Sequence, residues 1–436
     1  MLYERWREIA RENRDAIALR EIATGRNWTF EQLSGEVERR APSTGHVFPR
    51  GDNAEFVLQV LEAWRSRSIV CPLDAGQSAT MAGGALPPGI VHVKTTSATT
   101  AAPRHVLFTE EQLAADARNI VQTMGLRPDW PNLGTISLSH SYGFSNLVLP
   151  LLLHGIPLIL LPAPLPEALR LGATLAPDLT LAAVPALWRM WADAQAIPGN
   201  VRLAISAAAR LPLALERQVY ERQGVKIHNF YGSSECGGIA YDRGTESRTE
   251  ECCAGSAMEN VMLTIGEDGC LCVESDAVAQ TYWPEPQPNL GNGLFRTNDL
   301  VQITNGQVLL RGRASDQINV AGRKVSPETI ERILGEHPQV RECLAFGVPS
   351  PGAERGESIV ACLAADPKVD AAALREFLIA KLPAWQMPRD WWFVDSLASN
   401  RRGKISRADW RKRYLERNLG AKLGMAEAGS ERTRES

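Results

Sequence analysis

A repeated order of helix followed by strand constrains the fold of this chain more than any other feature of its sequence. Helical spacing of apolar residues followed by a short apolar strand recurs at about 110–140, 145–161, 166–184 and 212–231. Alternation of this kind predicts α/β layers around a largely parallel sheet. Near the start of the chain, Thr29 with Gln32 three residues later is expected to cap the beginning of a helix.

The chain changes character at about residue 255, where short alternating strands and glycine-containing turns begin. These predict a β-rich subdomain. After Arg313, a helix that begins at Ser326 with Pro327 in its first position, two strands and a further helix predict a small α+β domain. We therefore expect an N-terminal α/β domain over 1–313, a C-terminal domain over 314–417, and a disordered tail over 418–436.

Charge and hydrophobicity argue against two classes of protein. The chain has 47 basic and 50 acidic residues, so it lacks the strongly basic balance typical of proteins that bind nucleic acid. Residues 147–166 carry no charge and are long enough to span a bilayer, but five prolines would deprive a lipid-exposed helix of backbone hydrogen bonds. We expect a buried helix there, a turn at His154-Gly155 and a buried strand over 156–161, and no membrane span.

The cysteines and the start of the chain favour a cytoplasmic protein. The eight cysteines form no C-x-x-C pair, so neither a structural zinc site nor a disulfide scaffold is expected. The charged, amphipathic first residues do not fit a secretory signal.

Two polar segments in the first domain are candidates for binding a nucleotide. Residues 96–104 are dense in hydroxyl groups and end in Arg104, a combination that suits phosphate oxygens but also occurs in ordinary loops. Residues 229–235 leave an apolar strand through Gly232, and strand ends in α/β sheets commonly bind ligands. There an aromatic side chain can stack on a purine and Glu235 can hold Mg²⁺ through oxygen; the alternative is a polar turn with a structural glutamate.

Three later segments carry charged residues that also suit a nucleotide site. Asp299 lies among apolar strand residues, where its carboxylate can accept two hydrogen bonds from a ribose diol. The alternative is an aspartate that only stabilises a turn. Residues 312–328 form either an active-site wall or an ordinary basic linker. Lys404, beside a glycine in a basic loop, can move onto a forming anionic centre, or it belongs to a solvated run of charge.

The motifs NFYGSSE, TNDL, GRASDQINVAGRKVSPETIE and GKISR occur in that order. Together they resemble the superfamily of AMP-forming acyl-CoA synthetases, nonribosomal peptide synthetase adenylation domains and beetle luciferases, over about residues 1–415. The resemblance implies a body that binds ATP and the acyl substrate, a mobile C-terminal lid, and ATP with Mg²⁺ as cofactors. It also implies that a carboxylic acid is activated as its adenylate and passed to a thiol.

The resemblance also implies roles for single residues at the phosphates. The family loop T-S-G-T-T-G-x-P-K, which grips the pyrophosphate end of ATP, is matched by Thr96, Ser97, Thr99, Thr100 and Pro103, with Arg104 at its lysine. Ala98 and Ala101 replace its two glycines, although glycine is the residue that allows positive φ and close approach to phosphate.

The adenine side of the site is implied in the same way. Tyr231 stacks on adenine, Ser234 contacts the α-phosphate and Glu235 holds Mg²⁺, and the other implied ATP-binding residues are Asn229, Phe230, Gly232, Ser233, Ala208 and Ala209. Ala207 and Ala208 stand where glycines are usual, so added methyl groups are expected to narrow the acyl pocket or crowd the adenine edge. Arg210, at a usual proline, pairs with an anionic substrate or is a surface arginine.

The remaining implied roles concern the sugar, the acyl group and the lid. Asp299 and Arg313 contact the ribose, although Asn298 replaces the usual glycine before the aspartate. His140 stands at the aromatic residue that gates the acyl pocket, or it is a partly exposed histidine at a strand end. Lys404 bridges the carboxylate and the α-phosphate. Ser315 is the hinge, and Gly322 lies on the loop that enters the site for thiol transfer.

Three functions follow from the sequence. The favoured one is an acyl-CoA ligase. The second is a stand-alone adenylating enzyme that loads the phosphopantetheine of a carrier protein in trans. The third is a degenerate homologue that binds nucleotide or acyl ligand without turnover, which the alanine replacements motivate. Retention of Glu235, Asp299, Arg313 and Lys404 argues against it. The identity of the acid and the oligomeric state stay open.

Overall fold

The structure, a computed structural model, describes residues 1–74, 77, 84–95, 104–350, 356–397 and 405–418. The described chain divides into two compact units. The larger contains the residues up to Thr297 together with Val301–Leu310, and the smaller contains Asn298–Leu300 and the residues from Arg311 onward. The division falls within two neighbouring strands, β18 (Leu294–Thr304) and β19 (Gln307–Arg313).

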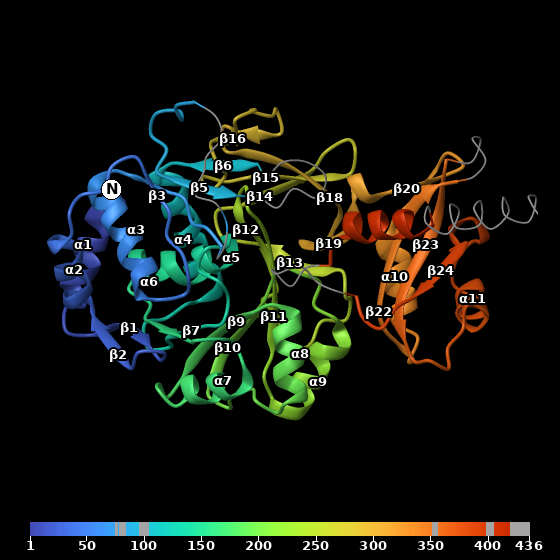
Figure 1. Ribbon diagram of the computed structural model, residues 1–436, viewed down its shortest axis with the longest axis horizontal. Coiled ribbons are helices and arrows are strands. Elements are labelled where there is room, and N and C mark those ends of the chain that lie inside the picture. Colours follow the sequence, from blue (N-terminus) through green and yellow to red (C-terminus); the bar gives the residue numbers. More distant parts are fainter. Residues whose placement is uncertain (75–76, 78–83, 96–103, 351–355, 398–404, 419–436) are drawn as a thin grey trace, which may run out of the picture. The chain divides into compact units, whose positions relative to one another are not determined.

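The core of the larger unit is a parallel sheet, as the alternation of helix and strand predicts. Its parallel strands, in spatial order, are β1 (Ile17–Glu21), β8 (Leu158–Leu160), β7 (Asn132–Gly134), β9 (Leu179–Ala183), β10 (Val201–Ser206) and β11 (Ile227–Ser233). Every residue of β8 and β9 is buried, because helices cover both faces of a parallel sheet. These helices include α4 (Glu110–Met124), α6 (Leu149–His154), α7 (Pro166–Ala173), α8 (Pro185–Asp193) and α9 (Leu213–Gln223) (Figure 1).

The β-rich segment continues this same sheet. Beyond β11 the order is β12 (Gly237–Tyr241), β13 (Cys253–Ala257), β19, β18, β15 (Cys270–Glu274) and β14 (Met262–Ile265), while β17 (Leu290–Gly291) pairs with β18. Because β11 pairs with β10 in parallel and with β12 antiparallel, it marks the change between the two halves of the sheet.

A second sheet and an N-terminal group of helices complete the larger unit. The sheet order is β16 (Thr281–Trp283), β6 (His105–Phe108), β5 (His92–Thr95), β4 (Ile69–Val70) and β3 (His46–Val47). The N-terminal elements are α1 (Leu2–Glu12), β2 (Arg26–Thr29), α2 (Phe30–Arg39) and α3 (Ala54–Ser66). The expected cap of α2 is confirmed: Thr29 Oγ1 accepts from Gln32 N, and Gln32 Oε1 accepts from Thr29 N.

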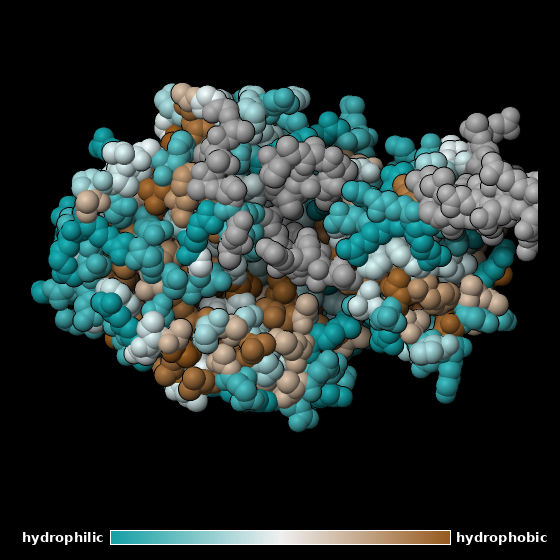
Figure 2. Space-filling view, viewed as in Figure 1, coloured by the Kyte–Doolittle hydropathy of each residue, from teal (hydrophilic) through white to brown (hydrophobic). Residues whose placement is uncertain are grey.

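The apolar run over 147–166 folds as expected. A π-helical turn, η1 (Phe144–Val148), leads into α6, which ends at His154-Gly155 before β8. Within the described ranges, the search for a helix with the length and hydropathy to cross a membrane finds none. On the face seen in Figure 2, hydrophobic residues form small separate groups among hydrophilic ones.

The smaller unit is an α+β domain with cores of its own. A three-stranded sheet pairs β22 (Val340–Pro349) antiparallel and β24 (Asp390–Phe393) parallel to β23 (Glu357–Ala365). The other elements are η2 (Ala314–Asp316), β20 (Ile318–Val320), β21 (Arg323–Val325), α10 (Pro327–Gly335), α11 (Ala371–Ile379), η4 (Ala384–Gln386) and a helix over 407–418. Helix α10 begins after Ser326 with Pro327 in its first turn, as predicted. Of the expected tail, residues 419–436 lie outside the described chain.

Candidate functional site

The turn that follows β11 is the centre of the candidate site. Strand β11 carries Tyr231 and Ser233 to its carboxyl end, where ligands gather in open α/β sheets. Ser233 Oγ accepts a hydrogen bond from Glu235 N at 3.1 Å. The Glu235 carbonyl accepts from Ala279 N at 2.8 Å. The backbone of Glu235 is therefore fixed on both sides, and its side chain is only partly buried.

Tyr282, on β16, brings two predicted residues together. Its hydroxyl donates to Glu235 Oε1 at 3.1 Å, and the Arg104 guanidinium lies 5.8 Å from its ring centre. Burial, together with the neighbouring Glu235 charge, raises the pKa of the Tyr282 hydroxyl, so it stays protonated and able to donate. Arg104 Nη1 also donates to Gln287 Oε1 at 3.3 Å. Tyr282 could not be singled out from the sequence, because only the pairing of β16 with β6 places it here.

The segment that carries His140 is joined to the same turn. Ser141 Oγ, one residue after the histidine, donates to Ser234 Oγ at 3.0 Å. His140 Nδ1 lies 3.3 Å from Asp74 Oδ1, and Ser139 Oγ donates to the same oxygen at 2.7 Å. Asp74 is a second residue that sequence reasoning missed. The structure thus brings His140, Ser234 and Glu235 into one neighbourhood.

Two further residues of the motif are buried within the sheet. Asn229 Nδ2 donates to the Cys253 carbonyl at 3.0 Å, and the Phe230 ring lies 5.8 Å from that of Tyr142. Gly232 is exposed on the same strand. Contact of these residues with a nucleotide stays a prediction.

The segment after β10 has an unusual backbone. Ala208 and Ala209 are exposed, and Ala208 has a φ of 69°, in the left-handed region that favours glycine. The alanine therefore occupies a backbone conformation suited to the residue that the family usually has there. Arg210 Nε lies 3.4 Å from Glu251 Oε1, an ion pair on the surface of the larger unit.

In the smaller unit, the two residues implied in ribose binding are neighbours. Arg313 Nε donates to Asp299 Oδ1 at 3.1 Å. Ser315, in η2, donates to the Asp316 carboxylate at 3.2 Å. Gly322 lies in the turn between β20 and β21, where its N–H donates to Asn319 Oδ1 at 3.0 Å.

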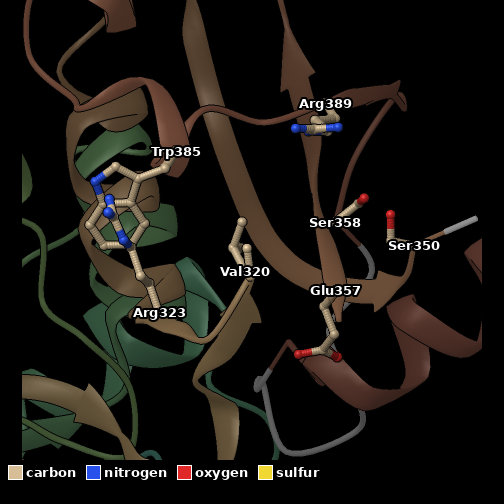
Figure 3. A pocket seen from close by; sticks show the side chains of 8 residues that line it. Val320, Arg323, Ser350, Glu357, Ser358, Trp385 and Arg389 are labelled. Carbon is tan, nitrogen blue, oxygen red and sulfur yellow. The ribbon is translucent and has the colours of Figure 1, made fainter. Parts of the chain in front are cut away.

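A pocket in the smaller unit begins beside Gly322. Figure 3 shows Arg323 next to Trp385, with 5.3 Å between the guanidinium carbon and the ring centre. The residues that line it are Val320, Ala321, Arg323, Ser350, Glu357, Ser358, Trp385 and Arg389. Two guanidinium groups and an indole give it features that suit phosphate and a flat aromatic group.

The remaining predicted residues are Thr96, Ser97, Thr99, Thr100 and Lys404, which lie outside the described residues together with Ala98, Ala101 and Pro103. Arg407, three positions after Lys404, is described and partly buried. Its Nη2 donates to Glu331 Oε1 at 2.8 Å and lies 3.1 Å from Glu328 Oε1, its Nε donates to the Ala345 carbonyl at 2.9 Å, and its Nη1 pairs with Asp316.

Comparison with known proteins identifies the family. The model of the AMP-binding enzyme matches residues 87–283, and that of the AMP-binding enzyme C-terminal domain matches residues 329–404. The chain belongs to the AMP-binding, adenylate-forming enzymes. The first match contains the whole β11 turn, and the second covers most of the smaller unit.

Individual relatives in this family are CoA ligases. Indoleacetate–CoA ligase from Aromatoleum aromaticum is 29% identical over 342 residues, covering 73% of this chain and 66% of the relative. The 2-hydroxy-7-methoxy-5-methyl-1-naphthoate–CoA ligase from Streptomyces carzinostaticus is 26% identical over 414 residues, covering 88% and 73%. The chain thus spans about two thirds of the length of these AMP-binding relatives.

Solved AMP-binding enzymes share the fold. The ATP-bound MatB from Rhodopseudomonas palustris has a TM-score of 0.83 at 20% identity, covering 95% of this chain and 98% of MatB. The o-succinylbenzoate CoA synthetase MenE from Bacillus subtilis, in complex with its acyl-adenylate OSB-AMP, has a TM-score of 0.79 at 19% identity, covering 92% and 96%.

Proposed function

We propose that this chain activates a carboxylic acid with ATP and transfers the acyl group to CoA, as an AMP-forming acyl-CoA ligase. The observation that carries the proposal is the β11 turn. There Ser234 and Glu235, within the stretch matched by the AMP-binding family, are hydrogen-bonded to the segment of His140 and to Tyr282.

In the first step a carboxylate oxygen of the acid attacks the α-phosphorus of ATP. A new O–P bond forms while the bond from the α-phosphorus to the bridging oxygen breaks, and pyrophosphate leaves with the electron pair. We assign adenine to Tyr231, the α-phosphate to Ser234 and the ribose diol to Asp299 and Arg313. Lys404 offsets the two anionic groups as they approach. Residues Thr96, Ser97, Thr99 and Thr100 are assigned to the leaving pyrophosphate.

We assign Mg²⁺ to Glu235 together with the triphosphate. The carboxylate offers the hard oxygen donor that Mg²⁺ prefers, and Mg²⁺ is commonly held by one or two carboxylates plus substrate phosphates. Among the residues that the structure describes, no group of three or more His, Cys, Asp or Glu is arranged for a metal ion, so a site completed by phosphate fits better than an all-protein site. The ion would offset the charge on the phosphates.

In the second step the CoA sulfur attacks the acyl carbonyl. A C–S bond forms, the C–O bond to AMP breaks, and the thiol loses its proton. The names of the relatives support CoA as acceptor, and so does the pocket beside Gly322, whose Arg323, Arg389 and Trp385 suit the phosphates and adenine of CoA. Between the two steps, we propose that the smaller unit turns about Ser315 as a lid.

The first experiment is carboxylate-dependent ATP–pyrophosphate exchange with aliphatic, aromatic and amino acids, for the wild type and Lys404→Ala. We expect exchange with one class of acid and a loss of about 100-fold or more in the variant. Exchange that needs no acid would contradict adenylation. Binding of Mg·ATP without exchange, across the whole panel, would favour the non-catalytic alternative.

The acceptor is tested by replacing Arg323 and Arg389 separately with alanine. If the pocket binds the nucleotide half of CoA, each change raises KM for CoA about tenfold but leaves KM for pantetheine unchanged, since pantetheine lacks the nucleotide. Arg332→Ala, on the exposed side of α10, is the matched control. Unchanged KM for CoA, with faster transfer to a carrier protein, would support the carrier-loading alternative.

A further inference from the structure

A lysine and an aspartate form a buried ion pair close to the candidate site. Lys94, on β5, is 4% exposed, and Asp116, on α4, is 1% exposed. The Lys94 ammonium lies 3.8 Å from Asp116 Oδ2 and 4.4 Å from the centre of the Phe108 ring. Burying two charges is unfavourable enough that neutral replacements of a pair are often as stable or more so. Stability alone therefore gives no reason for this pair.

The Asp116 carboxylate holds two other elements as well. Ser145 Oγ, in η1, donates to Asp116 Oδ2 at 2.5 Å and lies 3.4 Å from the Lys94 ammonium. Gly238 N donates to Asp116 Oδ1 at 3.4 Å. Gly237 packs directly on the carboxylate: a Cβ there would lie 2.0 Å from Asp116 Oδ1, so only glycine fits. The backbone after Glu235 thus rests on Asp116.

The elements joined by this pair are those that carry the predicted nucleotide residues. Lys94 precedes Thr96, the first hydroxyl of the predicted phosphate segment, by two positions. Gly237 follows Glu235 by two positions, and Ser145 lies on the helical turn that begins four residues after His140. Burial lowers the pKa of the Lys94 ammonium, and the charges of Asp116 and Glu235 oppose that shift, which places all three in one electrostatic neighbourhood.

We propose that Lys94 and Asp116 are positioning residues for Mg·ATP: they fix the strand that leads into the phosphate segment against the turn that carries Glu235, without touching the nucleotide. The inference rests on the proposed function, since that function assigns ATP to these segments. Neither residue belongs to the motifs that carry the family resemblance, so the inference rests on the contacts of this structure alone.

The test uses the double variant Lys94→Met, Asp116→Asn. The asparagine can keep its oxygen for Gly238 N and turn its amide NH2 towards Ser145 Oγ, which then accepts instead of donating. Removing both charges avoids leaving one of them unpaired in the core. The matched control is Lys226→Met, Asp242→Asn. Those two side chains are 9% and 11% exposed, with 2.7 Å between Lys226 Nζ and Asp242 Oδ2. Lys226 also pairs with Glu216, which keeps its ion pair with Arg248 in the control variant. The pair lies at the opposite end of the β11–β12 hairpin from Glu235.

Dissociation constants for Mg·ATP are measured by calorimetry on the full chain, with thermal unfolding of each variant recorded in parallel. We expect the site variant to unfold close to the wild-type temperature, yet to bind Mg·ATP about tenfold or more weakly, because displaced backbone segments lose hydrogen bonds to a charged ligand, each worth about 1.5–3 kcal/mol. The control is expected to bind within about twofold of wild type.

Wild-type affinity in a folded site variant would overturn the inference, and so would equal weakening in the control. If the site variant does not fold, the single variant Ser145→Ala replaces it, and unchanged affinity there overturns the inference too. A wild type that binds Mg·ATP but exchanges no pyrophosphate defeats the proposed function alone. A wild type that binds no Mg·ATP defeats both.

Discussion

Ala208 is a residue that does not suit the backbone conformation of its position. Its φ of 69° is favourable for glycine, and an L-residue with a Cβ is strained there. We expect Ala208→Gly to raise the free energy of unfolding by about 0.5–1 kcal/mol, since relief of strain exceeds the added entropy of the unfolded chain. Denaturant titration measures this.

Ala209→Gly is the matched control for that change. Ala209 is exposed on the same segment but is absent from the positive-φ residues of the described chain, so glycine there should lower stability slightly. If both variants shift stability in the same direction, strain at Ala208 is not the explanation.

Tyr282 makes a prediction about the carboxylate proposed to hold Mg²⁺. Its hydroxyl donates to Glu235 Oε1, and Tyr282→Phe removes that donor while keeping the ring. We expect the Mg²⁺ concentration for half-maximal pyrophosphate exchange to rise about tenfold, since hydrogen bonds to charged groups are the stronger ones. Tyr220→Phe, an exposed tyrosine on α9, should change nothing. If Tyr282→Phe needs the same Mg²⁺ concentration as wild type, Tyr282 does not support Mg²⁺ binding by Glu235.

At the scale of elements, the contacts of Arg407 hold the start of the last described helix to α10 and η2. Arg407→Met leaves the carboxylates of Asp316, Glu328 and Glu331 without their shared cation. The side chains of this cluster are 14–27% exposed, so we expect the free energy of unfolding at neutral pH to fall by about 1–3 kcal/mol, less than the about 3–5 kcal/mol typical of breaking a fully buried pair. Hydrogen exchange of the backbone amides of α10 in increasing denaturant measures the stability of the smaller unit.

The destabilisation caused by Arg407→Met should decrease as pH falls. Burial raises the pKa of Glu331 even beside Arg407, and without the guanidinium it should rise further. A carboxyl whose folded pKa lies above its unfolded value favours folding at low pH and loses that contribution as pH rises through the folded pKa. The difference in free energy of unfolding between wild type and Arg407→Met should therefore become smaller as pH falls from 7 towards the unfolded pKa of about 4.3. Arg411→Met, at a half-exposed pair with Glu357, should show no such trend.

Local signals predicted the elements well, and long-range pairing explains what they missed. The cap at Thr29, the turn at His154-Gly155 and the start of α10 are each decided by a few neighbouring residues, and all three are confirmed. The neighbours of the site are different. Tyr282 reaches Glu235 across 47 positions, and Asp116 reaches Gly238 across 122. No periodicity within one segment reports a contact between strands of two sheets, so Tyr282, Asp74 and Lys94 were invisible in the sequence.

For the whole molecule, the two units have separate hydrophobic cores, those of the larger unit containing Trp6 and Trp188 and those of the smaller containing Phe346 and Trp410. Separate cores are a common reason for unfolding in more than one step. Ligands that bind one folded unit should therefore shift its transition selectively, and the candidate residues Tyr231, Ser234 and Glu235 all lie in the larger unit.

Ligand-induced stabilisation of the full chain separates catalysis from mere binding. Mg·ATP at 100 times its dissociation constant should stabilise the folded chain by about 2.7 kcal/mol. Mg·ATP with the correct acid should give a further shift in the wild type, because the adenylate formed in the site joins the contacts of both substrates in one molecule. Lys404→Ala should keep the first shift and lose the second, since it binds ATP but forms adenylate slowly. Scanning calorimetry with ATP, acid and both measures the shifts, and an equal second shift in the variant would mean that the acid binds beside ATP without reacting.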